Sequence, residues 1–416
     1  MIRGFSARAV SLLSVVALTA SCSALQQTED SQNDSSGSIL IGHLTPKSGF
    51  LGQLGAKDLA GTKFAVDEIN TAGGLLGRQI ELISEDSVDP GVAVQKATSL
   101  VEDEKVDALF GEISSASGLA ISDIADRSKT TYFNTGWNSN EGRSEQCSRY
   151  VFHVDGNNSM YVSTVGLWVA EQEASQHYML TADYAFGHDL REETLRLLKE
   201  RVSGGKLVGD ELVPTGTRNY TSYIRKLTLA KPDDVFLNLA GEDQTTFLKQ
   251  YTQEYGAPFQ VTGGVMDTVQ FWAAGAENLT GVWPATYYHK LDTPANQEFV
   301  QRWRDKHNGT PPDNQAWQSY TAIKVWAAAV EKAGSVDTEA VVKALRSGMK
   351  FDVLKERPAV IRTQDNQLMY DMYAVEVDAK NMEDSYDIFN IQQPVPGPGR
   401  DLEEIQIPKE RSACSL

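Results

Sequence analysis

A short run of hydroxyl residues, Ser114, Ser115 and Ser117, holds the most chemical information in the sequence. It follows a buried-strand pattern that ends at Phe110 and precedes a helical pattern that begins at Gly118. Backbone N–H groups and hydroxyls therefore converge beside the positive end of a helix, an arrangement that binds a carboxylate without a cationic side chain. We expect Ser114 and Ser115 to hold such a group, and plain helix capping by serine is the alternative interpretation.

Polar and aromatic residues also follow two other predicted strands. In open α/β sheets, ligands bind beyond the carboxyl ends of the strands. Gly136, Trp137 and Asn138 follow the strand after the serine run, so the ends of both strands face the same point. In the second half of the chain, Tyr184 and Phe186 take the equivalent place, where they would cover a ligand or fill a purely structural role.

Motifs of catalysis are scarce. The sequence contains no G-x-S-x-G elbow, Walker loop, H-E-x-x-H helix or zinc-type cysteine pattern. The six histidines are scattered, and none pairs with another at the spacing of metal ligands. We therefore expect no catalytic residue, no metal and no cofactor. A secreted hydrolase is the enzymatic alternative, although no motif places a histidine near Ser115.

The elements that must position these residues alternate between strand and helix. In the first half, strands are predicted at Ser38–Gly42, Gln79–Glu85, Val106–Phe110 and Thr130–Asn134. In the second half, strands are predicted at His177–Thr181, Lys206–Val213, Val235–Leu239 and Phe259–Thr262. Such alternation is typical of a parallel sheet covered on both faces. The expected fold class is therefore α/β, with two doubly wound parallel-sheet lobes joined by a multi-strand hinge.

The last third of the chain departs from this alternation. Three helical stretches are predicted at Ala295–His307, Ala316–Ala333 and Thr338–Arg346. Helices without intervening strands cannot build a third parallel sheet, so we expect them to cover the first lobe. The predicted first lobe comprises residues 38–157 and 286–362, and the second comprises residues 158–285 and 363–390. Residues 391–416, with the proline-rich Pro394–Pro398, are expected to form an irregular tail.

The N-terminus has the pattern of a secretory signal, because Arg3 and Arg8 precede an apolar stretch that stops before Cys22. Leu18–Cys22 resembles a bacterial lipobox, so residues 1–22 are the expected signal peptide and Cys22 the lipidation site. Residues 23–37 have the composition of a flexible tether. One lipid anchor would hold the protein at an extracytoplasmic membrane surface without making it integral.

The net charge limits which partners are expected, and the cysteine content bears on disulfide formation. The chain has 38 basic and 56 acidic residues, a formal net charge of -18, and no basic block, which argues against nucleic acid as a partner. If Cys22 is lipidated, Cys147 and Cys414 remain in an oxidising compartment. A disulfide between them is the default expectation, and two unpaired cysteines are the alternative.

Several segments together resemble the type I periplasmic binding proteins of the branched-chain amino acid and amide uptake family. The matching segments are Gly42–Gly49, Asp67–Arg78, Glu85–Asp86 before Asp89–Pro90, Gly111–Ser115 and Asp183–Gly187. Their order and spacing agree from Ile39 to about Asp378. The resemblance implies two lobes linked by three strands, closure on a small-molecule ligand, and delivery of that ligand to the membrane subunits of an ABC importer. We expect the protein to be a monomer.

The resemblance also implies roles for individual residues. Ser115 and Asn138 would hold a ligand carboxylate, and the carbonyl of Gly136 would face an ammonium group. Phe50 and Leu54 lie on the loop that touches the ligand side chain.

The residue expected to pair with an ammonium group departs from the family pattern. Val265 stands in its place, and Asp267 is the only nearby carboxylate. If Asp267 does not reach the pocket, the ligand would be an aromatic or aliphatic acid, an amide or a urea. A ligand sensor for a signalling partner is a further functional alternative.

Overall fold

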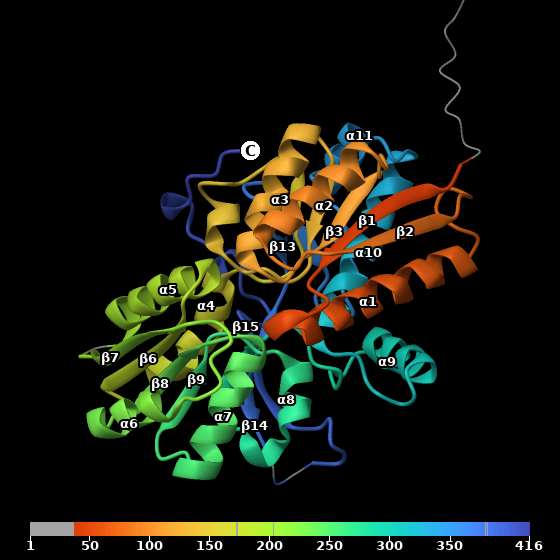
Figure 1. Ribbon diagram of the computed structural model, residues 1–416. Helices are drawn as coiled ribbons and strands as arrows, with labels where there is room; N and C mark the ends of the chain where they lie inside the picture. The colour runs from red at the N-terminus through yellow and green to blue at the C-terminus, as the bar shows by residue number, and fades with distance from the viewer. Residues whose placement is uncertain (1–36, 172–173, 203, 379, 381) are drawn as a thin grey trace, which may run out of the picture. The chain divides into compact units, whose positions relative to one another are not determined.

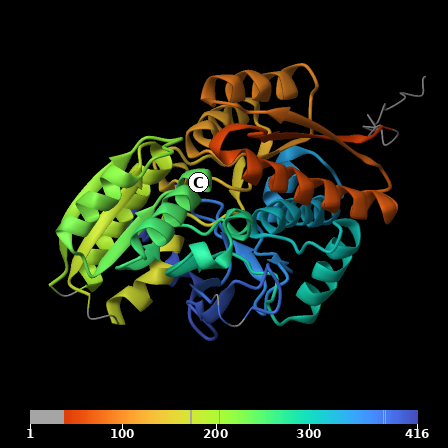
Figure 2. The same cartoon turned by 60° about the horizontal axis from the view of Figure 1, so that its bottom comes forward.

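A computed structural model describes residues 37–416 of the chain, except for 172–173, 203, 379 and 381. The predicted signal peptide, Cys22 and the predicted tether up to residue 36 lie outside the described residues. Ser38–Leu416 form one unit, which Figures 1 and 2 show from two directions. No helix in the described part of the chain combines the length and the apolar character needed to cross a membrane.

The first lobe is built on a five-stranded parallel sheet with the strand order β2-β1-β3-β4-β5. Its strands are β1 (Ile39–Thr45), β2 (Ile80–Asp86), β3 (Ala108–Gly111), β4 (Thr131–Asn134) and β5 (Val151–His153). Short 3-10 turns, η1 (Gly49–Leu51) and η2 (Asn140–Arg143), follow β1 and β4.

Helices cover both faces of this sheet, because successive strand residues point to opposite sides. On one side, Leu109 and Tyr132 belong to a core cluster with residues of α2 (Pro90–Glu102) and α3 (Ser115–Ser128). On the other side, Phe110 stacks on Phe133 and meets Trp326 edge to face. That side is covered by α1 (Gly52–Thr71) and α10 (Asn314–Ala333).

The second lobe is built on a seven-stranded sheet with the order β15-β14-β10-β9-β8-β6-β7. The parallel strands are β6 (Gln176–Ala182), β7 (Lys206–Val213), β8 (Asp234–Asn238), β9 (Gln260–Gly263) and β10 (Val282–Ala285). The strands β14 (Met372–Val377) and β15 (Phe389–Val395) add to it in antiparallel pairing. The helical elements of this lobe are α4 (Asn158–Glu171), α5 (Ala185–Arg201), α6 (Thr221–Ala230), α7 (Gly241–Tyr255), α8 (Thr268–Ala274) and the 3-10 turn η3 (Ala276–Asn278).

The chain passes between the lobes three times. The first crossing, residues 154–157, joins β5 to α4, and the second, residues 286–293, joins β10 to α9 (Pro294–Lys306). The third, residues 370–371, joins β13 (Leu368–Met369) to β14. With β11 (Lys350–Phe351) and β12 (Ala359–Ile361), β13 forms a small antiparallel sheet.

The three helices expected to return to the first lobe do so. In Figures 1 and 2 the cyan and blue helices α9, α10 and α11 (Thr338–Leu345) lie beside the red and orange first lobe. Gly61 of α1 permits the close approach of α10, since a Cβ there would lie 2.2 Å from the backbone oxygen of Ala316. Asp313 begins α10 by accepting a hydrogen bond from the N–H of Ala316.

The end of the chain is more ordered than the sequence predicts. The strand β15 continues to Val395, past the expected boundary at residue 390, and includes Pro394. Proline lacks a backbone N–H, but β15 is the edge strand of its sheet, where that loss is tolerated. Two 3-10 turns follow, η4 (Leu402–Ile405) and η5 (Lys409–Arg411).

The tail after β15 contacts both lobes. Cys414 forms the expected disulfide with Cys147 in the first lobe. Arg411 forms an ion pair with Glu193 of α5 in the second lobe. The tail is therefore a fourth link between the lobes, in addition to the three crossings.

Candidate ligand-binding site

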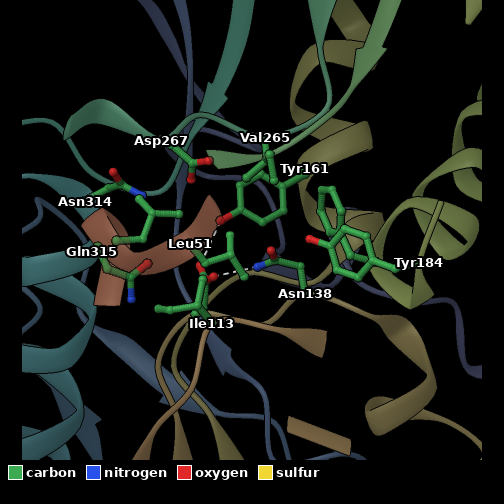
Figure 3. Close-up of a pocket in the computed structure, with 14 residues that line it drawn as sticks. Leu51, Ile113, Asn138, Tyr161, Tyr184, Val265, Asp267, Asn314 and Gln315 are labelled. Atoms are coloured by element: carbon green, nitrogen blue, oxygen red, sulfur yellow. Dashed lines mark hydrogen bonds between the residues drawn. The ribbon is translucent and has the colours of Figure 1, made fainter. Parts of the chain in front are cut away.

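A cavity lies between the two lobes at the carboxyl ends of their strands, where Figure 3 shows side chains from both lobes converging. Fourteen residues line it: Leu51, Leu54, Ile113, Gly136, Asn138, Asp155, Tyr161, Tyr184, Phe186, Ala240, Val265, Asp267, Asn314 and Gln315. One wall is aliphatic, with two leucines, an isoleucine and a valine, and the remainder combines aromatic rings, amides and two carboxylates.

The sequence-predicted ligand residues divide into two groups. Six of them line the cavity: Leu54, Gly136, Asn138, Tyr184, Phe186 and Asp267. The other four, Phe50, Ser114, Ser115 and Trp137, are not among the lining residues. Four of the six, Gly136, Asn138, Tyr184 and Phe186, follow predicted strands, and the family resemblance supplied Leu54 and Asp267.

The serine turn is occupied by an acidic side chain of the protein itself. The backbone N–H groups of Ile113 and Ser114 donate to Oε1 of Glu112, at 3.0 and 2.8 Å. Glu112 is fully buried, and burial raises its pKa to about 7 against the hydrogen bonds that lower it. Two of the N–H donors expected to bind a ligand carboxylate are thus already satisfied within the chain.

Ser115 is buried and does not line the cavity, and its Oγ accepts a hydrogen bond from the N–H of Ser139 at 3.3 Å. We expect Ser115→Ala to lower the free energy of unfolding by about 1 kcal/mol, the usual contribution of such a bond. Ligand affinity should stay within about threefold of wild type, a difference well under 1 kcal/mol. Calorimetry would check this, and a loss above about tenfold would instead place Ser115 in contact with the ligand.

Trp137 and Phe50 support the site from outside the lining. Trp137 is fully buried, donates from Nε1 to the Tyr132 hydroxyl, and packs so closely against Gly118 that a Cβ there would lie 2.3 Å from the indole ring. Phe50 meets Tyr184 edge to face, with ring centroids 6.0 Å apart. This pair joins the first lobe to the second.

Asp267 reaches the cavity, although it lies two residues after the position that matches the family pattern. Its carboxylate accepts a hydrogen bond from the N–H of Gly241 at 2.8 Å, at the start of α7. The side chain is 5% exposed, and burial raises its pKa to about 6 while the Gly241 bond lowers it. The carboxylate is therefore available to a positively charged ligand group.

Six lining residues were missed by sequence reasoning: Leu51, Ile113, Asp155, Tyr161, Asn314 and Gln315. Val265 and Ala240 also line the cavity, at positions where the family pattern has an acidic and an aromatic residue. Asp155 and Tyr161 follow β5, which is only three residues long and was not predicted. Recognition of that strand would have pointed to Asp155 by the same strand-end rule that found Asn138. Asn314 and Gln315 begin a distant helix, and no local signal marks them.

The lobes are closed against each other. The volume of the cavity that the centre of a water molecule can occupy is about 20 Å³. This volume holds little more than one water molecule. A Cβ on Gly241 of the second lobe would lie 2.5 Å from the backbone oxygen of Phe50 in the first. Asn140 of the first lobe also donates its N–H to Asp189 of the second, at 2.8 Å. Entry of a ligand therefore requires the lobes to separate.

The ionisable side chains that line the cavity are all acidic. The set includes two carboxylates and no Lys, Arg or His. Across the described residues, no group of three or more His, Cys, Asp or Glu side chains is placed to hold a metal ion. The geometry is that of a closable site for a small organic molecule between two hinged lobes.

The chain belongs to the periplasmic binding protein family, whose model matches residues 38–382. A protein named Leu/Ile/Val-binding protein homolog 7 from Brucella melitensis is 27% identical over 346 residues, covering 76% of this chain and 86% of the relative. The family works outside the cytoplasm and binds small molecules.

Solved structures agree with this assignment. A periplasmic binding protein from Burkholderia mallei has a TM-score of 0.83 and 26% identity, and the match covers 91% of this chain and 99% of the other. A solute-binding protein from R. palustris, solved in complex with benzoate, has a TM-score of 0.80 and 22% identity over 91% of this chain and 100% of the other. The second match shows the shared fold alone.

Proposed function

We propose that the protein is the solute-binding component of an ABC importer, and that it captures a small amino acid or related ammonium-bearing solute by closing its lobes. The observation that carries this proposal is the pair of buried carboxylates in a cavity without a cationic side chain. Leucine and a simple acid both bring a carboxylate into this poorly solvated space, but only the amino acid also brings an ammonium group that offsets part of the negative charge.

The similar proteins include both amino-acid binders by name and a binder of a simple acid. One group is named for leucine, isoleucine and valine, and one structural neighbour holds benzoate. The aliphatic wall of Leu51, Leu54, Ile113 and Val265 suits a branched side chain. Aromatic acids and amides or ureas are the alternatives, and the acidic lining disfavours the acids.

The proposal extends to the cellular setting. A monomer anchored through a lipid on Cys22, with residues 23–37 as its tether, would reach the membrane subunits of the importer without being integral to the membrane. The support for this part is the lipobox-like Leu18–Cys22 segment that follows the apolar stretch.

Asp267→Asn tests the ligand class. We expect the variant to bind L-leucine about 10- to 100-fold more weakly, because a hydrogen bond to a charged group contributes about 1.5–3 kcal/mol. Isothermal calorimetry should compare L-leucine with 4-methylpentanoate, which has the same carbon skeleton and no amino group.

The matched control is Asp123→Asn, an exposed carboxylate on α3 that does not line the cavity. It should bind leucine as the wild type does. If wild-type protein binds 4-methylpentanoate or benzoate and none of the amino acids, the amino-acid proposal is wrong.

A further inference from the structure

The first crossing between the lobes carries a carboxylate that lies in the cavity wall. Asp155 is 2% exposed. Its Oδ1 accepts hydrogen bonds from the N–H of Gly156 at 2.7 Å and from the Tyr161 hydroxyl at 2.8 Å, and its Oδ2 accepts one from the Asn138 amide at 2.5 Å. In Figure 3, dashed lines run from the Tyr161 hydroxyl and from the Asn138 amide to the same group.

The donors to this carboxylate come from separate parts of the molecule. Asn138 follows β4 of the first lobe, and Tyr161 lies on α4 of the second. Gln318 of α10 donates its amide to Oδ1 of Asp155 and, at 3.1 Å, to the Thr286 hydroxyl in the second crossing. The Asp155 side chain therefore connects both lobes and two of the crossings.

The third crossing joins the same cluster. The Tyr370 hydroxyl donates to the backbone oxygen of Val154 at 2.8 Å, and the Gln367 amide donates to that of Asp155 at 2.8 Å. The third crossing thus contacts the first directly, and the second crossing is linked to Asp155 through Gln318. A group bound to the Asp155 carboxylate would therefore contact the segments that connect the lobes.

The buried cations nearby donate hydrogen bonds to other groups and not to this carboxylate. Arg143 donates to the backbone oxygens of Trp137, Ser139 and Asp155 and to the Gln367 side chain. Lys355 donates to the backbone oxygens of Thr286 and Asp371. The described donors to the Asp155 carboxylate are all neutral, with three on Oδ1 and one on Oδ2. Because a carboxylate oxygen has two lone pairs, Oδ2 can accept another donor.

We propose that Asp155 is a specificity-determining residue, whose Oδ2 accepts a hydrogen bond from the ammonium group of the ligand and ties the ligand to the segments that connect the lobes. This inference rests on the proposed function, because it requires an ammonium-bearing ligand. It adds a second carboxylate, on the hinge, to Asp267 on the second lobe.

The proposal predicts that ligand affinity depends on pH. Burial raises the pKa of Asp155 to about 7, against the lowering effect of its hydrogen bonds and of Arg143. The charged or titratable groups around it are Arg143, Tyr161, Asp267, Lys355 and Tyr370. An ammonium ligand binds the ionised carboxylate, so binding releases a proton. Affinity should therefore rise as the pH rises through the pKa, by about three- to tenfold between about pH 6 and about pH 8.

The test is calorimetry with L-leucine on wild type, Asp155→Asn and the control Asp123→Asn. We expect Asp155→Asn to weaken leucine binding about 10- to 100-fold and to reduce the pH dependence. The control should retain both the affinity and the pH dependence of the wild type. Equal leucine affinity in Asp155→Asn and wild type, with an unchanged pH profile, would overturn the inference.

The failures of the two proposals are separable. If wild-type protein binds no amino acid, the proposed function is wrong, and the role of Asp155 is rejected with it. If wild type binds leucine and only the Asp155→Asn result disagrees, the role of Asp155 alone is rejected. If Asp155→Asn does not fold, the wild-type profile decides: affinity that is flat between about pH 6 and about pH 8 overturns the inference.

Discussion

Replacing Cys147 and Cys414 together with alanine is expected to lower the free energy of unfolding by about 4–5 kcal/mol. The disulfide joins residues separated by 267 positions, and closing a long loop removes much conformational freedom from the unfolded chain. Removing the bond also frees the tail, so that Arg411 is no longer held covalently near Glu193. Urea unfolding monitored by tryptophan fluorescence would measure the change.

The control for this experiment is wild-type protein with its disulfide reduced. It should unfold at the same urea concentration as the double variant, because both lack the same covalent link. A midpoint shared by the double variant and oxidised wild type would contradict the prediction, and would mean that noncovalent contacts alone hold the tail.

Arg143→Met is expected to destabilise the protein by about 3–5 kcal/mol, the range for removing one partner from a buried charged network. Burial lowers the pKa of Arg143 to about 10, against the raising effect of Asp155, Asp365 and Asp189, so the side chain is charged at neutral pH. Its guanidinium satisfies the backbone oxygens of Trp137, Ser139 and Asp155. Methionine fills much of the volume but donates no hydrogen bond, and these oxygens would lose the donor.

Arg149→Met is the matched control. Arg149 is exposed and forms an ion pair with the similarly exposed Glu339. Thermal and urea unfolding should show a large shift for Arg143→Met and almost none for Arg149→Met. Similar small shifts for both variants would show that the buried guanidinium is replaceable.

The alternation of strands and helices predicted both lobes. Each apolar run that reads as a strand is followed by a segment that reads as a helix with one apolar face, and this order is typical of a parallel sheet covered by helices. Short elements were harder to predict. β5 (Val151–His153) has only three residues, and its position depends on pairing with β4. β14 and β15 pair antiparallel at one edge of the second sheet. Nothing in the local sequence shows that these two strands join that edge of the sheet. Pro394 argues against a strand there, because proline is tolerated only where a strand has a neighbour on one side and none on the other.

The candidate site was predictable where it follows a recognised strand. Gly136 and Asn138 follow β4, and Tyr184 and Phe186 follow β6. The serine turn shows why the prediction of an anion site needed tertiary information. Glu112 has a positive φ of 76°, and its own side chain binds the amides of the turn. Motif reasoning recognised the donors but could not show that they were already occupied.

The tail that returns to Cys147 also affects how the protein withstands proteolysis. All three interlobe crossings lie between Cys147 and Cys414, within the stretch that the bond encloses. A protease that cleaves one exposed loop in this stretch leaves two fragments that are still covalently connected. A fragment can leave only after a second cleavage or after reduction, so one nick does not separate the lobes.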